Sequence, residues 1–152
     1  MNQDILKKIL TNLYNKKLSP DEAIKKLRTM PYENIGFAKI DHHRELRSGL
    51  PEVIYGLGKS AIQLKEIIQR LQKAKSNILA TKISGDKYKK IKASLPKKAI
   101  YNAQGETLII KNSIKTKGKG LITIITAGTS DIPVAEEAAS TANLLGSKVE
   151  KI

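Results

Sequence analysis

The stretch Leu121–Ser140, "LITIITAGTSDIPVAEEAAS", limits the fold more than any other part of the chain. Residues 121–125 are apolar apart from one threonine and predict a buried parallel strand. An alanine-rich segment follows and predicts a helix, with Pro133 suited to its first turn. The later run "SKVEKI" predicts a second strand, so we expect a β-α-β unit over this part of the chain.

The turn between this strand and helix is the strongest candidate for a binding site. Gly128 permits a tight turn, Thr129 and Ser130 offer hydroxyls, and Asp131 or Ser130 can cap the helix. Backbone amides at a helix start, together with the helix dipole, favour an anion beyond the end of a parallel strand. A capped helix start that binds nothing remains the alternative at this point.

The first 112 residues predict a pair of helices followed by a small α/β unit. Ser19 is expected to cap the second helix, with Pro20 and Glu22 in its first turn. Strands then alternate with helices. The expected elements are helices over 3–17 and 20–30, strands over 35–41 and 51–56, a helix from 60 to 71, a strand over 77–84, a short helix over 84–93, and a hairpin over 99–111 that turns at 104–105.

We therefore predict an α/β protein with four parts. They are an N-terminal helical pair over 1–34, an α/β domain over 35–112, a basic linker over 113–119 and the β-α-β unit over 120–152.

The positive charge of the chain has two interpretations. The net charge is +14, and residues 76–120 carry 11 basic and only 2 acidic residues. Such a stretch attracts nucleic acid, but lysine-rich surfaces also serve as solubilising cover, and we favour the second interpretation. Only Tyr88 and Tyr101 lie near these lysines, so no platform for stacking bases is predicted.

Composition excludes several classes of protein. The chain has no cysteine, so it can form no disulfide, thiolate metal site or cysteine nucleophile. No apolar run approaches the roughly 18–20 residues that cross a bilayer. The N-terminus indicates an amphipathic helix rather than a signal peptide, so we expect a cytoplasmic protein without a membrane partner.

Two shorter motifs carry less weight. "GLGKS" at Gly56–Ser60 resembles the end of a phosphate-binding loop, but Val53 stands where that loop needs a glycine. We therefore predict a glycine turn with Ser60 as a helix cap, and no nucleotide hydrolysis.

The charged segment "DHHRELRSG" begins at Asp41. Adjacent histidines on a strand point to opposite faces, so His42 and His43 do not predict a metal site. The arginines can form ion pairs with neighbouring carboxylates or clamp an anion, and both interpretations stay open. We keep as candidate substrate or interface residues Asp41, His42, Arg44 and Arg47.

Taken together, "DHHRELRSGLPEVIYGLGKS" and "GLITIITAGTSDIPVAEEAASTANLLGSKVEKI" resemble the LarB family, the pyridinium-3,5-biscarboxylic acid mononucleotide synthases of nickel-pincer nucleotide cofactor biosynthesis. The resemblance spans residues 35–152, and both motifs keep their order. The C-terminal part is similar to the aminoimidazole ribonucleotide carboxylase and mutase family. This implies that 120–152 forms the first β-α-β portion of a Rossmann-like, flavodoxin-like three-layer carboxylase domain.

The resemblance also implies an activity. Such enzymes carboxylate the pyridinium ring of nicotinic acid adenine dinucleotide with carbon dioxide or bicarbonate, and they cleave its phosphoanhydride to release AMP. It further implies that the substrate contacts the turn formed by Ala127, Gly128, Thr129, Ser130 and Asp131, with amides and hydroxyls at the phosphate and a carboxylate at the ribose. No bound cofactor or metal is expected. The complete family enzyme is expected to assemble as a homo-octamer.

The chain departs from the family pattern at one residue that the family's chemistry requires. The family uses a cysteine that adds to the pyridinium ring, and this chain has none. We therefore expect a truncated chain, without catalytic residues, that does not complete the reaction alone. Two alternatives stay open: a basic module that binds nucleic acid, and an enzyme that acts on aminoimidazole ribonucleotide. We favour the dinucleotide over both of these ligands.

Overall fold

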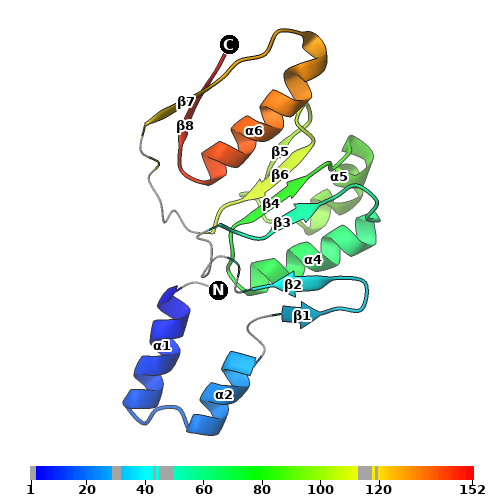
Figure 1. Cartoon of the computed structure of the whole chain (residues 1–152). Coiled ribbons are helices and arrows are strands. Elements are labelled where there is room, and N and C mark those ends of the chain that lie inside the picture. Colours follow the sequence, from blue (N-terminus) through cyan, green and yellow to red (C-terminus); the bar gives the residue numbers. More distant parts are fainter. Residues whose placement is uncertain (1–2, 29–31, 43, 45–49, 113–117, 119) are drawn as a thin grey trace.

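The computed structural model describes residues 3–28, 32–42, 44, 50–112, 118 and 120–152. It is a mixed α/β structure that ends in a β-α-β unit of the flavodoxin-like type, as predicted (Figure 1). The helices are α1 (Gln3–Tyr14), α2 (Pro20–Arg28), α4 (Ala61–Lys73), α5 (Gly85–Ile91) and α6 (Ile132–Leu144). The strands are β1 (Tyr32–Asn34), β2 (Lys39–Asp41), β3 (Val53–Tyr55), β4 (Ile78–Thr81), β5 (Ile100–Asn102), β6 (Thr107–Ile110), β7 (Leu121–Ile124) and β8 (Lys148–Lys151).

The central sheet has the strand order β3-β4-β6-β5. β3 and β4 are parallel, whereas β6 is antiparallel to both β4 and β5. Side chains of β4 alternate between the two faces: Ile78 and Ala80 join the core under α4 and α5, and Leu79 points to the opposite face. Every residue of β4 and β6 is buried, which explains why these strands read as continuous apolar runs.

Helix α6 covers the second face of this sheet. Leu144 packs against Leu79 of β4 and Ile109 of β6, and the buried hydroxyl of Thr107 donates to the hydroxyl oxygen of Ser140 at 3.0 Å. On its other side α6 contacts the parallel pair β7–β8. The order of layers is therefore α4 and α5, central sheet, α6, and β7–β8 (Figure 1).

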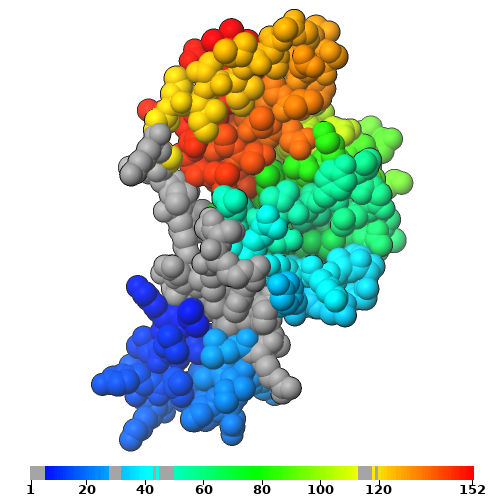
Figure 2. Space-filling view, viewed as in Figure 1, coloured from blue at the N-terminus to red at the C-terminus, as the bar shows by residue number. Residues whose placement is uncertain are grey.

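The helical pair α1–α2 has a small core of its own. Ile9 and Ala23 are its buried residues, and partly buried leucines surround them. Ser19 caps α2 as predicted: its hydroxyl accepts from the Glu22 amide, and the Glu22 carboxylate accepts from the Ser19 amide. The pair lies at one end of the molecule, and the β7-α6-β8 unit lies at the other (Figure 2).

Two predictions about strands were wrong. Residues 35–41 do not form one strand; β1 and β2 form a hairpin, because Gly36 adopts a left-handed φ of 85° and its amide donates to the Asn34 side chain. The strand β7 is parallel, as expected, but it is not buried. Leu121 is 58% exposed and Ile122 is 42% exposed, since α6 covers only one face of the pair.

None of the helices in the described ranges is both long and apolar enough to cross a membrane.

Candidate binding turn

The predicted turn lies between β7 and α6 and is open to solvent. Ala127, Gly128, Thr129, Ser130 and Asp131 are all exposed. The pairing of β7 with β8 continues almost to this turn, because the Thr126 amide donates to the Ile152 carbonyl at 3.0 Å. Thr129–Asp131 form a single 3-10 turn that runs directly into α6. The structure therefore brings all five sequence-predicted residues together at one strand end.

The capping prediction was only half correct. Asp131 occupies the N-cap position of α6, but its carboxylate makes no capping hydrogen bond, and Pro133 lies in the first helical turn as expected. The helix start is closed by the backbone instead, since the Asp131 amide donates to the Gly128 carbonyl at 3.1 Å. Within the described residues, the Asp131 carboxylate and the amides of Thr129 and Ser130 have no hydrogen-bond partner. These groups are available to a ligand.

Gly128 shapes the space in front of the turn rather than the turn itself. Its φ of −145° is extended backbone that any residue adopts, so the turn does not require glycine for its conformation. A Cβ at this position would lie 3.7 Å from Ser130 Oγ and 4.0 Å from Asp131 Oδ2. Glycine thus leaves open the space that these two side chains border.

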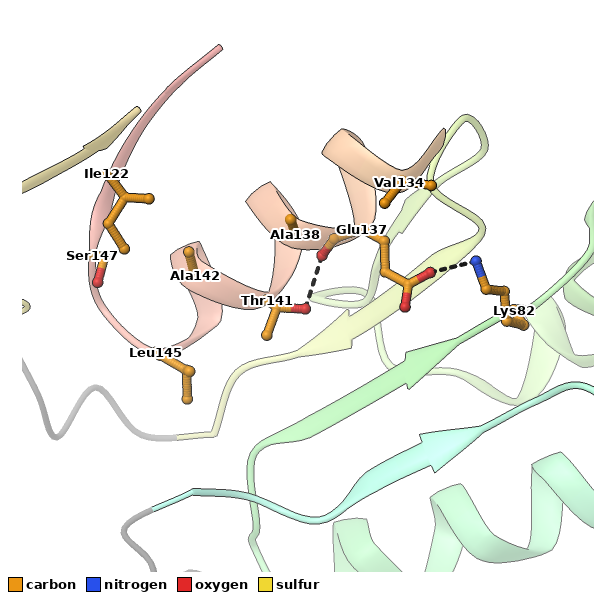
Figure 3. Close-up of a pocket in the computed structure, with 9 residues that line it drawn as sticks. All are labelled: Lys82, Ile122, Val134, Glu137, Ala138, Thr141, Ala142, Leu145 and Ser147. Atoms are coloured by element: carbon orange, nitrogen blue, oxygen red, sulfur yellow. Dashed lines mark hydrogen bonds and ion pairs between the residues drawn. The ribbon is translucent and has the colours of Figure 1, made fainter. Parts of the chain in front are cut away.

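The first half of α6 is fixed to the central sheet by charged groups. The Glu136 carboxylate accepts from Asn102 Nδ2 at 2.6 Å and also pairs with Lys151 of β8. Lys82, at the end of β4, pairs with Glu137 at 2.7 Å (Figure 3). The hydrogen bond and charge of Glu137 raise the pKa of Lys82, and the bonds from Lys151 and Asn102 lower the pKa of Glu136. The position of the turn is therefore tied to the sheet through α6.

A cavity of about 490 Å³ runs along the side of α6, away from the turn. Its apolar floor comes mostly from α6, with Ile122 on one wall and Lys82 on the other (Figure 3). It is lined by Lys82, Ile122, Val134, Glu137, Ala138, Thr141, Ala142, Leu145 and Ser147. None of the five turn residues borders it, so the turn and this cavity are separate features.

The "DHHRELRSG" segment follows the hairpin β1–β2. Asp41 is the last residue of β2, and His42 Nε2 lies 3.0 Å from Glu33 Oε2 of β1. Glu33 also accepts from Arg70 of α4 at 2.8 Å, so His42 belongs to a network that joins the hairpin to α4. Arg44 is exposed, and His43 and Arg47 lie outside the described residues. A substrate role for Asp41, His42, Arg44 and Arg47 stays a prediction.

Three lysines were not identified from the sequence as a group. Lys59, Lys82 and Lys87, here called the lysine cluster, lie at the carboxyl ends of the parallel strands β3 and β4. Lys59 follows β3, whereas Lys82 and Lys87 follow β4 and lie five residues apart, so the pairing of β3 with β4 brings Lys59 to the other two. The sequence feature that could have identified them is their position: each lysine lies within six residues of the end of a strand, and α/β sheets bind ligands at that edge.

The described residues support nucleic-acid or metal binding less well than they support a ligand at the turn. Tyr88 and Tyr101 stack on each other, with ring centroids 4.0 Å apart, so their faces are not both open to bases. No group of three or more histidine, aspartate or glutamate side chains with metal-binding geometry occurs among the residues that the structure covers.

The fold and the turn define an α/β protein whose last parallel strand pair ends at an open helix start. Comparison with known proteins adds the family. The model of the LarB/PurE-like N-terminal domain matches residues 32–113, more than half of the chain. The chain therefore belongs to the LarB/PurE family.

A relative from Methanocaldococcus jannaschii, "Uncharacterized protein MJ0165", is 37% identical over 149 residues. The match covers 93% of this chain and 57% of the relative. The chain thus spans a little over half the length of this relative.

Proposed function

We propose that this chain binds nicotinic acid adenine dinucleotide as part of an enzyme of cofactor biosynthesis. In the proposed reaction a carbon–carbon bond forms between the pyridinium ring and carbon dioxide, and the ring carbon loses its proton. Water cleaves the phosphoanhydride, which gives pyridinium-3,5-biscarboxylic acid mononucleotide and AMP. The family supports a carboxylase or mutase role in cofactor biosynthesis, and the identity of the substrate is our inference.

The observation that carries this proposal is the open turn at the start of α6. The amides of Thr129 and Ser130 point from a helix N-terminus without a partner among the described residues, a setting that suits a phosphate. The uncommitted Asp131 carboxylate can accept hydrogen bonds from ribose hydroxyls. Because Glu136 and Glu137 fix α6 to the sheet, these groups are held in place before the ligand arrives.

The test is a titration of the purified chain with nicotinic acid adenine dinucleotide, followed by amide NMR shifts. We expect shifts centred on Gly128–Asp131. The variant Asp131→Asn should raise the Kd about tenfold, the range of a lost charge-assisted hydrogen bond. Glu150→Gln, on the exposed strand β8, is the matched control and should not change the Kd. Shifts confined to other residues, or an unchanged Kd for Asp131→Asn, would contradict the proposal.

By itself the chain is proposed to bind the dinucleotide without turning it over. It contains no cysteine to add to the pyridinium ring. Incubation with the dinucleotide and bicarbonate should therefore release no AMP. The same assay on the longer Methanocaldococcus jannaschii relative tests whether the longer protein releases AMP. AMP release by this chain alone would refute the proposed division between binding and chemistry.

A further inference from the structure

The lysine cluster surrounds the end of β3. Lys59 Nζ donates to the Tyr55 carbonyl at 2.8 Å, and Lys87 Nζ donates to the next carbonyl, that of Gly56, at 2.9 Å. Lys82 follows the neighbouring strand β4 and pairs with Glu137. Lys59 and Lys87 thus place two ammonium groups on consecutive carbonyls at the carboxyl end of β3, and Lys82 lies at the end of the adjacent parallel strand β4.

The charges of this cluster are not balanced. Glu137 neutralises Lys82, and Glu106 also acts on it electrostatically. Neither Lys59 nor Lys87 forms an ion pair with a carboxylate in the described residues. An ammonium group has three donors, and each of these two uses one on a backbone carbonyl. Donors and positive charge therefore remain for an external anion.

A groove borders Lys59, and aromatic residues contribute to its lining. The Tyr55 side chain is 52% exposed. Tyr55 and Lys59 border a groove of about 300 Å³ between β3 and the β1–β2 hairpin, which Phe37 also lines. Lys39 and Glu52 line the groove as well. The groove thus combines aromatic surface with an ammonium at its edge.

The backbone at this strand end is unusually constrained. Lys82 adopts a φ of 55°, in the left-handed region that non-glycine residues seldom occupy. It lies between the buried residues Thr81 and Ile83. Gly56 is packed so closely that an added Cβ would lie 2.3 Å from Ile83 Cδ1 and 2.8 Å from the Thr81 carbonyl oxygen. The ends of β3 and β4 are therefore held in one arrangement.

We propose that this strand end binds a nucleoside 5′-phosphate, with the phosphate on Lys59 and Lys87 and the base against Tyr55. The inference rests on the proposed function and assigns this subsite to the adenylate half of the dinucleotide. The Lys82–Glu137 ion pair joins the subsite to α6, and Glu137 lies six residues beyond Asp131, about 9 Å along the helix. In this arrangement one half of an extended dinucleotide occupies the binding turn and the other half occupies the lysine cluster.

The experiment is a titration of the chain with AMP, followed by amide NMR shifts and calorimetry. We expect shifts at Gly56, Gly58 and Lys59. Lys59→Gln and Lys87→Gln should each raise the Kd for AMP about tenfold. Lys59→Arg keeps the charge and should retain most of the affinity. Lys90→Gln, which changes an exposed lysine on the same helix as Lys87, is the matched control and should leave the Kd unchanged.

Several results would overturn the assignment. They are AMP shifts confined to Gly128–Asp131, equal affinity for adenosine and AMP, an unchanged Kd for both glutamine variants, and tighter binding of a mixed-sequence oligonucleotide than of AMP. The comparison of AMP with adenosine uses the unaltered chain, so the inference stays testable if a glutamine variant fails to fold. The proposed function is tested by a different experiment, the titration with the dinucleotide and the variant Asp131→Asn. Its failure can therefore be distinguished from failure of this assignment.

Discussion

Asp131 and Glu136 lie five positions apart at the start of α6, yet their surroundings are opposite. Asp131 is exposed and makes no capping bond. The Glu136 side chain is only 12% exposed and bonds to Asn102 and Lys151. The first carboxylate is therefore available to a ligand, whereas the second connects the helix to two strands. Sequence pattern assigned both residues to one helix but could not separate these roles, since the partners of Glu136 come from distant parts of the chain.

The role of Glu136 predicts a pH dependence of stability. Its pKa is lower in the folded protein than in the unfolded chain, first because of the bond from Lys151 and then because of the bond from Asn102. Between these two pKa values the unfolded chain binds more protons, so the contribution of Glu136 is present above its ordinary pKa of about 4.5 and is lost as pH falls through the folded value.

Urea unfolding of the wild type and of Glu136→Gln at pH 7 and pH 3 measures this contribution. The wild type should be more stable at pH 7, and the difference should shrink at pH 3. Glu150→Gln, at an exposed position of β8, should show no such change between the two pH values. A difference of equal size at both pH values would assign the effect to packing instead of charge.

At the scale of elements, helices were easier to predict than short strands. Ser60 caps α4 through its hydroxyl and Gln63, a local signal that sequence shows directly. The hairpin β1–β2 was missed because its strands have three residues each and its turn depends on Gly36 and the side chain of Asn34. The turn between β5 and β6 was predicted correctly at Gln104–Gly105, but its contact with α6 was not visible in the sequence.

This contact makes Gly105 a sensitive position. A Cβ there would lie 2.9 Å from the backbone carbon of Glu136 and from the backbone nitrogen of Glu137. Gly105→Ala should destabilise the protein by about 1–3 kcal/mol, because the turn and the helix must move apart. Gly85→Ala is the control, since nothing lies within 4 Å of an added Cβ and helix propensity favours alanine. The denaturant midpoints of the two variants measure the difference. Equal stability of both variants would contradict the prediction, because the hairpin would then move away from α6 with no loss in the free energy of unfolding.

At the scale of the whole molecule, the family domain and the β-α-β unit share a core. The central sheet is covered on both faces only because α6 packs against the face opposite α4 and α5 (Figure 1). This arrangement was not predictable from periodicity. The alanine-rich sequence predicted the helix α6, but nothing in the sequence distinguished packing against its own strands from packing against an earlier sheet. The lysine cluster depends on the same long-range arrangement, since Lys82 reaches α6 through Glu137.

The shared core predicts that damage to α6 spreads to the central sheet. Leu144 is 7% exposed and packs between β4 and β6 through Leu79 and Ile109. Leu144→Ala should lower the free energy of unfolding by about 2–4 kcal/mol, the usual cost of truncating a buried leucine. Native-state hydrogen exchange should show faster exchange in β4 and β6 as well as in α6, because they open as one cooperative unit.

Leu10→Ala on α1 is the matched control for this prediction. Leu10 is 50% exposed in the helical pair at the other end of the molecule, so its truncation should cost less than about 1 kcal/mol. It should also leave exchange in β4 and β6 unchanged, since the buried core of that pair is Ile9 and Ala23 alone among the described residues. If Leu144→Ala accelerates exchange only in α6, β7 and β8, the two parts unfold independently. In that case α6 cannot hold the binding turn and the lysine cluster in a fixed relation.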